Sequence, residues 1–228
     1  MKFKLPLLLT AIMAATAIFT VEAEKRVSIL GDSYSTFKGF VQPESNTCWY
    51  FSQQDTTRTD VQSVRQTWWH RLLKDKGFLL ERNNSFSGST ISTSGYSGED
   101  FTDRSFTTRV CDLGSPDIIL IFGATNDSWA NAPIGEFKYN GITRDDLKSF
   151  RPALAYLLET AIDRYPNARI YYMVWDGIKP ELINSAEEIS LHYSVPFRVI
   201  RDIEVKNGHP TVKGMQSIAR QVESFISE

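Results

Sequence analysis

The chain has 228 residues, of which 42% are hydrophobic and 23% charged, and its formal net charge is −2 at pH 7. This length and composition are typical of one globular domain with a substantial core. The sequence contains no dense cluster of Lys and Arg, so a nucleic-acid partner is not expected.

The first 23 residues are predicted to be a secretory signal peptide. Lys2 and Lys4 form a basic start, residues 5–21 are largely apolar, and Val21 and Ala23 suit a cleavage site after residue 23. A membrane anchor is the alternative, but the apolar run is slightly short for a span and contains Pro6. We therefore expect an exported protein, periplasmic or secreted, with one domain over residues 24–228 and no stable membrane insertion after cleavage.

Five short runs of apolar, β-branched and aromatic residues are predicted to be strands, over residues 26–30, 78–83, 117–123, 169–175 and 196–202. Residues 118–122 are apolar at every position, as in a strand of a parallel sheet that is covered on both faces. Helical patterns fall between most of these runs. The alternation of strand and helix indicates an α/β domain with three layers.

Four helices are predicted from capping residues and periodicity. Ser63 and Gln66 form a capping box before the first helix, which Gly77 ends. A second helix is capped by Thr143, with a kink or restart expected at Pro152. A weaker third helix covers residues 180–193, and a fourth follows Thr211 to residue 226 with one apolar stripe.

Two long segments, residues 34–60 and 86–113, are rich in Ser, Thr, Gly and Asp. Each follows the carboxyl end of a predicted strand, so both are expected at the same edge of the sheet. Loops of this length in a compact domain are usually functional.

Four short blocks carry residues suited to acyl transfer. Gly31-Asp32-Ser33 follows the first strand, and a serine at a strand tip is well placed for a nucleophile if a base lies beside it. Residues 84–90 follow the second strand, residues 123–127 follow the third, and residues 207–211 precede the last helix. Each block alone also suits an ordinary turn; their order and their positions together make a functional interpretation specific.

These four blocks resemble those of the SGNH hydrolases, also called the GDSL esterase and lipase family, from about residue 26 to 226. The resemblance implies a three-layer α/β/α, flavodoxin-like fold with a five-stranded parallel sheet. It also implies that Ser33 is the nucleophile and His209 the general base. The Ser33 N–H, the Gly88 N–H and the side-chain amide of Asn126 would then form the oxyanion hole.

The sequence departs from the family pattern at two positions. Ala124 stands where glycine is usual, and Lys206 stands three residues before His209, where the family has aspartate. A lysine cannot orient a neutral imidazole. We expect Asp202 or Glu204 to be the third catalytic member, with a backbone carbonyl near Lys206 as the alternative. Activity is expected to rise through a pKa near neutrality as His209 loses its proton.

The two cysteines, Cys48 and Cys111, could form a disulfide or stay free, and the sequence leaves this open. Two cysteines and three histidines at scattered positions give no metal-ligand spacing, so neither a metal nor another cofactor is predicted. The oligomeric state is not predicted.

Aromatic residues in the loops suggest the substrate class. Tyr34, Trp49 and Trp129 are candidates for stacking on sugar rings, and no lid-like amphipathic helix suggests an interfacial lipase. We expect an esterase that removes small acyl groups, acetyl in particular, from a glycan. The alternatives are a broad short-chain esterase or lipase and a non-catalytic glycan-binding protein. A nucleotide binder is disfavoured because Gly31-Asp32-Ser33 lacks the glycine spacing and the lysine of a phosphate loop.

Overall fold

A five-stranded sheet forms the centre of the protein, with strand order β2-β1-β3-β4-β5 and parallel pairing throughout. The computed structural model describes residues 24–228, and the predicted signal peptide lies outside the described residues. The strands are β1 (Arg26–Gly31), β2 (Leu79–Asn83), β3 (Ile118–Phe122), β4 (Arg169–Trp175) and β5 (Phe197–Ile200). The predicted flavodoxin-like α/β/α fold is confirmed, and all five predicted strands are present.

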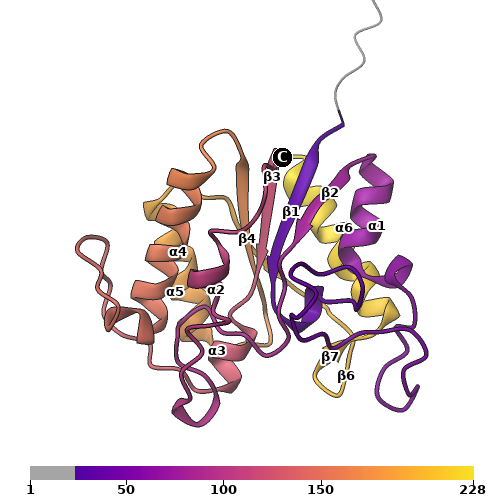
Figure 1. Ribbon diagram of the computed structural model, residues 1–228, viewed down its shortest axis with the longest axis horizontal. Helices are drawn as coiled ribbons and strands as arrows, with labels where there is room; N and C mark the ends of the chain where they lie inside the picture. Colours follow the sequence, from indigo (N-terminus) through magenta and orange to yellow (C-terminus); the bar gives the residue numbers. More distant parts are fainter. Residues whose placement is uncertain (1–23) are drawn as a thin grey trace, which may run out of the picture.

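Helices cover both faces of the sheet (Figure 1). The α-helices are α1 (Trp68–Lys76), α2 (Phe106–Arg109), α3 (Thr125–Trp129), α4 (Phe150–Arg164), α5 (Pro180–His192) and α6 (Val212–Ile226). Successive strand residues point to opposite faces, so the sheet has two cores. Ile29 and Leu120 face α1 and α6, whereas Leu30 and Ile121 face α4 and α5. All four of these side chains are fully buried.

The predicted helix starts are shifted by short 3-10 turns. The capping box of Ser63 and Gln66 is present, but it caps the turn η2 (Val64–Gln66), and Thr67 then caps α1. Pro152 lies in the first turn of α4, where its missing N–H is not needed, so the expected kink or restart takes the form of a new helix start. A second turn, η4 (Asp146–Lys148), precedes α4.

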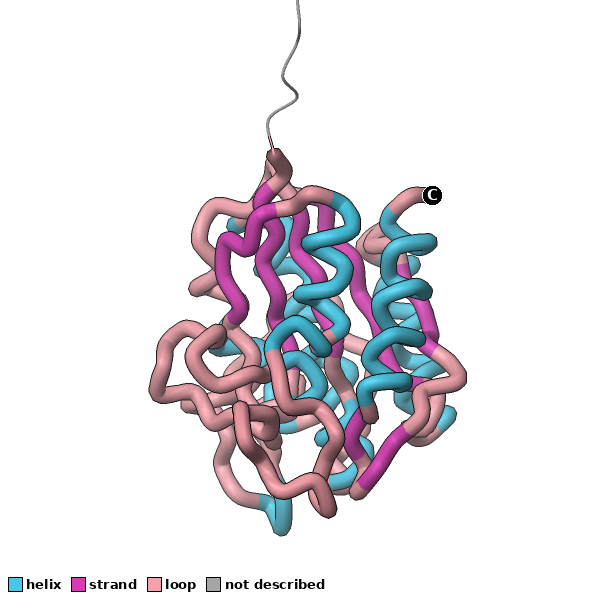
Figure 2. Tube along the Cα trace, turned by 90° about the vertical axis from the view of Figure 1, so that its right-hand side faces the viewer, coloured by secondary structure: helices cyan, strands magenta, loops and turns pink. Residues whose placement is uncertain are grey.

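The long loops gather at the carboxyl ends of the strands, at the bottom of Figures 1 and 2. A small hairpin of β6 (Val205–Lys206) and β7 (His209–Pro210) lies at the same end. Strand order reverses between β1 and β3, and ligands of such sheets bind beside this reversal, outside the carboxyl ends. Within residues 24–228, no helix is both long and apolar enough to cross a bilayer.

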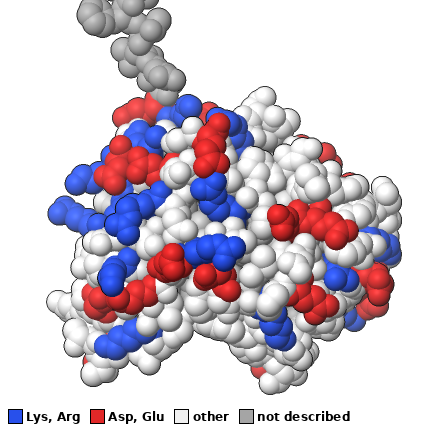
Figure 3. All heavy atoms as spheres, turned by 180° about the vertical axis from the view of Figure 1, so that it is seen from behind, with Lys and Arg blue, Asp and Glu red and all other residues white. Residues whose placement is uncertain are grey.

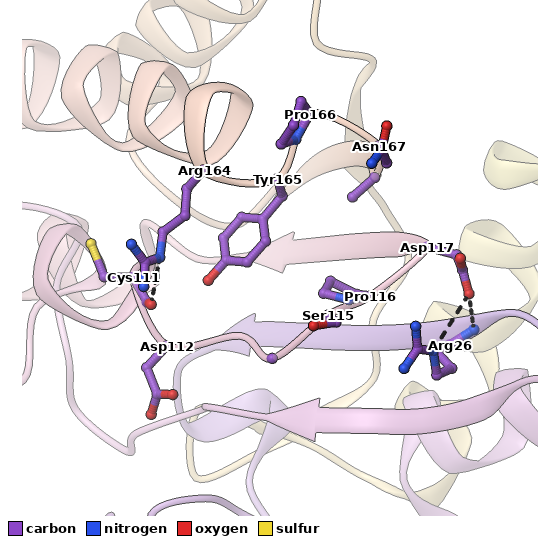
Figure 4. Close-up of a pocket in the computed structure, with 12 residues that line it drawn as sticks. Arg26, Cys111, Asp112, Ser115, Pro116, Asp117, Arg164, Tyr165, Pro166 and Asn167 are labelled. Carbon is purple, nitrogen blue, oxygen red and sulfur yellow. Dashed lines mark hydrogen bonds and ion pairs between the residues drawn. The ribbon is translucent and has the colours of Figure 1, made fainter.

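The opposite end of the sheet holds a polar cavity of about 600 Å³ (Figure 4). Its charged groups contact other protein groups. The Arg26 backbone N–H donates to Asp117 at 2.7 Å, the Arg26 guanidinium lies 4.0 Å from the same carboxylate, and Arg164 donates to the Cys111 carbonyl at 2.7 Å. Because these groups pair with one another, they do not converge on a common ligand position.

The surface carries charges of both signs, and the two thiols are not bonded to each other. On the face that Figure 3 shows, acidic and basic side chains are interspersed, with no continuous basic area. Cys48 is partly exposed, Cys111 is exposed, and both are free. No group of three or more metal-ligating side chains occurs within the described part of the chain.

Candidate active site

Ser33 lies in a single 3-10 turn, η1 (Ser33–Ser35), directly after β1. The side chain of Asp32 caps this turn by accepting the Tyr34 N–H at 3.0 Å. Gly31 is required at the end of the strand, because an added Cβ would lie 2.6 Å from the Ser35 side chain. The local sequence therefore turns the chain sharply and places Ser33 at the carboxyl edge of the sheet.

His209 meets Ser33 across the sheet edge. Its Nε2 lies 3.0 Å from Ser33 Oγ, and its Nδ1 lies 2.9 Å from the carbonyl oxygen of Asn207. Because a carbonyl only accepts hydrogen bonds, Nδ1 carries the proton of the neutral ring. Nε2 is then free to accept the Ser33 proton, which is the arrangement that a general base requires.

Neither expected acid, Asp202 or Glu204, is hydrogen-bonded to His209 within residues 24–228. Glu204 accepts hydrogen bonds from Thr211 Oγ1 at 2.8 Å and Lys213 Nζ at 3.1 Å. Asp202 is exposed beyond the end of β5, with a φ of 52°. Among residues 24–228, the Asn207 carbonyl is the hydrogen-bond partner of Nδ1, because the tight β6–β7 turn brings that carbonyl under the ring.

Lys206 points away from His209. Its ammonium donates to the Thr56 carbonyl at 2.8 Å, and the neighbouring Asn207 amide donates to the Arg58 carbonyl at 3.0 Å. Tyr34 and Tyr50 donate to the carbonyls of Gly208 and Pro210 from the other side. The segment that carries His209 is therefore held by hydrogen bonds from the loop of residues 34–60.

Asn126 offers a free donor at the same edge. It lies in α3, and its Oδ1 accepts the Tyr96 hydroxyl at 2.6 Å. Its Nδ2 is buried without a hydrogen-bond partner within the described residues. An unpaired buried amide is costly, and such groups are often found where a ligand atom completes the bonding.

Gly88 and Ser33 each supply a backbone N–H that is also a free hydrogen-bond donor. Gly88 has a φ of +86°, a conformation that glycine adopts without strain. Within residues 24–228, neither the Gly88 N–H nor the Ser33 N–H donates a hydrogen bond to another protein group. Backbone N–H groups of this kind can stabilise a developing oxyanion.

Buried charged groups hold the Gly88 loop in place. The guanidinium of Arg109 bonds to the Asn84 carbonyl and to Ser89 Oγ. The carboxylate of Asp127 accepts the N–H groups of Ile91 and Ser92 at 2.7 and 3.0 Å. Arg109 and Tyr96 were not singled out from the sequence, because each acts through a contact between distant loops. The Asn207 carbonyl corresponds to the alternative of a backbone carbonyl near Lys206.

Ala124 occupies a strained conformation. Its φ is +78°, in the left-handed region that favours glycine, which explains the family glycine at this position. The neighbouring Gly123 is needed for packing, because an added Cβ there would lie 2.6 Å from the Phe106 ring.

The predicted substrate-binding aromatics have different environments. Tyr34 is 1% exposed and is part of the core. Trp49 stacks on His209, with 3.5 Å between ring centroids, and Arg58 covers its other face at 3.9 Å. Neither side chain therefore presents a free ring face to a sugar, and both are removed from the substrate-binding set. Trp129 is 40% exposed and lies edge-on to His209, so it remains a candidate for stacking on a sugar ring.

Burial changes the acid–base properties of the site. The pKa of His209 is lowered to about 4, chiefly by burial and also by the nearby charge of Arg58, while the Asn207 hydrogen bond acts in the opposite direction. Burial raises the pKa of Asp32 to about 7, although the Tyr34 N–H and the charge of Arg109 act in the opposite direction. The imidazole is consequently a neutral base well below pH 7.

The fold and the site together define a class of ester hydrolase with a serine at the tip of the first strand. The family model for GDSL-like lipase/acylhydrolase matches residues 25–226. The chain belongs to this family.

Two solved structures are closely similar. A protein designated a GDSL-like lipase from Bacteroides ovatus is 50% identical, with a TM-score of 0.87, over 90% of this chain and 99% of that chain. Its counterpart from Bacteroides uniformis is 51% identical, with a TM-score of 0.88, over 90% and 97%. An acetyl xylan esterase from Butyrivibrio proteoclasticus shares the fold at 15% identity and a TM-score of 0.60, over 90% and 64%. A search of curated proteins gave no match.

Proposed function

We propose that this protein is an exported serine esterase that removes small acyl groups, acetyl in particular, from carbohydrate. The observation that carries the proposal is the 3.0 Å contact between Ser33 Oγ and His209 Nε2, with the opposite ring nitrogen held by a carbonyl. The free Nδ2 of Asn126 supports it, since a neutral donor at this edge can stabilise an oxyanion.

The reaction proceeds in two halves. Ser33 Oγ attacks the ester carbonyl carbon while His209 Nε2 takes the serine proton. The N–H groups of Ser33 and Gly88 and the amide of Asn126 stabilise the oxyanion. The C–O bond then breaks, the alcohol leaves with the proton from His209, and acyl-Ser33 remains. Water, deprotonated by His209, attacks this ester, and the acid leaves as Ser33 regains its proton.

Three features favour a small acyl group on a sugar. Ser33 is only 2% exposed, which restricts the room around the reacting carbon. The large exposed apolar side chains of the described residues are few, namely Phe40, Leu79, Trp129, Leu191 and Val205. Trp129 lies near Gly208 and edge-on to His209 and is 40% exposed, so its indole can contact a sugar ring beside the reacting serine.

The proposal is tested by hydrolysis of p-nitrophenyl acetate, butyrate and octanoate and by acetate release from acetylated xylan. We expect acetate to be preferred over the longer esters and acetate to be released from the glycan. Ser33→Ala should abolish turnover, whereas Ser52→Ala, at an exposed loop serine, should not. Equal rates on octanoate would favour a broad esterase or lipase. Glycan binding without Ser33-dependent turnover would favour a binding protein.

A further inference from the structure

We propose that Thr36 and Trp49 are positioning residues that align His209 with Ser33, the task that a third-member carboxylate performs elsewhere. This inference rests on the proposed function, in which Ser33 is the nucleophile and His209 the base. It adds two residues that touch neither the substrate nor the reacting carbonyl.

The four residues form a closed circuit of contacts. Thr36 Oγ1 donates to the Ser33 carbonyl at 3.0 Å and accepts the Trp49 N–H at 2.9 Å. The Trp49 ring stacks on the His209 ring with 3.5 Å between centroids and 5° between planes. His209 Nε2 closes the circuit at 3.0 Å from Ser33 Oγ. One fully buried hydroxyl, Thr36 Oγ1, therefore fixes both the nucleophile turn and the ring that supports the base.

The stack supplies a constraint that the Asn207 carbonyl cannot supply. A single hydrogen bond at Nδ1 sets the tautomer, but small changes in the side-chain torsions χ1 and χ2 can still tilt the imidazole plane while that bond is kept. A parallel ring at van der Waals distance restricts this tilt. Trp129 restricts the imidazole further, with its ring 5.9 Å away at 69°.

The loop that carries Trp49 is itself well fixed. The Trp49 carbonyl accepts the Gln54 side-chain amide at 2.9 Å. Arg58 lies over the outer ring face at 3.9 Å, and it forms no ion pair within residues 24–228. The ring is therefore enclosed between a guanidinium and an imidazole, which gives it one stable orientation.

Substitutions at Thr36 separate positioning from bulk packing. Thr36→Val keeps the shape and removes the hydroxyl, and we expect kcat to fall on the order of 10- to 100-fold with KM nearly unchanged. Thr36→Ser keeps the hydroxyl and should restore most of kcat. The matched control is Thr107→Val, because Thr107 is buried in α2 and, among residues 24–228, its hydroxyl is hydrogen-bonded only to Ser105. A Thr36→Val enzyme with the kcat of the control would overturn the proposal.

An NMR measurement reports the stack without any turnover. The Cε1 proton of His209 should be displaced upfield by the ring current of Trp49. This displacement should be lost in Trp49→Leu and kept in Trp49→Phe, and kcat should follow the same order. An unshifted His209 resonance in the wild-type protein, or a Trp49→Leu enzyme with full kcat, would overturn the proposal.

The two readouts keep the two proposals distinguishable. A wild-type protein without Ser33-dependent turnover contradicts the proposed function, whatever the NMR spectrum shows. An active wild-type enzyme whose kcat is unaffected by Thr36→Val and Trp49→Leu contradicts only the positioning role.

Discussion

The hydroxyl of Tyr96 donates a 2.6 Å hydrogen bond to Oδ1 of Asn126 and thereby fixes which end of that amide is left free. Burial raises the pKa of Tyr96 to about 12, so the phenol remains a donor throughout the neutral range. The free end, Nδ2, is the group proposed to stabilise the oxyanion.

Removal of this hydroxyl should weaken catalysis without weakening substrate binding. Tyr96→Phe lets the Asn126 amide rotate, and we expect kcat to fall about tenfold, less than the roughly hundredfold loss expected for Asn126→Ala. Steady-state kinetics on p-nitrophenyl acetate measure both. Tyr156→Phe, on α4, is the control, and a Tyr96→Phe enzyme with the same kcat as this control would remove Tyr96 from the site.

The acid limb of the pH profile should lie far below neutrality. The pKa of His209 is lowered to about 4, chiefly by burial. Because the base must be neutral, kcat/KM should rise through about pH 4 and stay level through pH 6.5, contrary to the rise near neutrality expected from the sequence. Rate measurements from pH 3.5 to 8 decide this, and a midpoint near pH 6.5 would show that His209 is more solvated than described.

Substitution of Arg58 should shift the acid limb of the pH profile. The charged groups near His209 are Arg58 on the loop, Asp32 beside Ser33, and Glu204 and Lys206 on the hairpin side. Among these groups, Arg58 is the one whose charge lowers the pKa of His209. Arg58→Gln should therefore shift the acid limb to higher pH. Lys38→Gln, on the same loop, is a charge-matched control, and equal shifts in both variants would indicate a general charge effect.

Neither expected third-member acid should be needed for turnover. Asp202→Ala and Glu204→Ala should keep kcat within about twofold, since His209 contacts the Asn207 carbonyl. Glu204→Ala should lower the thermal midpoint slightly, because Glu204 accepts from Thr211 and Lys213. A large kcat loss in either variant, with the fold retained, would reinstate that carboxylate.

Asp32 should make stability fall as pH rises from about 4 to about 7. In this range its carboxyl is protonated in the folded protein, where its pKa is about 7, and ionised in the unfolded chain. The folded state therefore binds the extra proton, and its advantage is lost as pH passes the folded pKa. His209 acts with the opposite sign, since its folded pKa lies below the ordinary 6.5.

The difference between wild type and Asp32→Asn isolates the Asp32 contribution. The Asn variant keeps a carbonyl for the Tyr34 N–H and carries no titrating group. Thermal midpoints measured from pH 4 to 8 should show the variant gaining stability relative to wild type as pH rises. A constant difference would mean that Asp32 ionises at its ordinary pKa.

The alternation of strands and helices could be predicted from the sequence, because each element leaves a signal in its own residues. The all-apolar run of β3, the cap at Thr211 and the left-handed Gly77 each leave a signal within a few residues. Three of the four blocks could also be placed at strand ends, and the fourth could be placed directly before the last helix. The strand order brings them together at the edge between β1 and β3.

The finer arrangement of the site could not be predicted, since it depends on contacts between distant loops. Trp49 belongs to a loop without periodicity, and nothing in its neighbourhood indicates that it stacks on a residue 160 positions away. The Asn207 carbonyl carries no side-chain signature. Short elements such as α2 and the β6–β7 hairpin are too brief to produce a pattern.

Lys206 supports the β6–β7 hairpin, which carries His209, in a different way from the aspartate that is usual in the family at this position. Its ammonium ties the β6–β7 hairpin to the Thr56 carbonyl on the protein surface. An aspartate at this position would have to turn inward, and the hairpin would lose that surface attachment. Lys206→Asp alone therefore does not restore a triad. A side chain at this position can either turn inward to contact His209 or turn outward to anchor the hairpin to the loop. The Asn207 amide, which donates to the Arg58 carbonyl at 3.0 Å, would then be left to hold the hairpin to this loop.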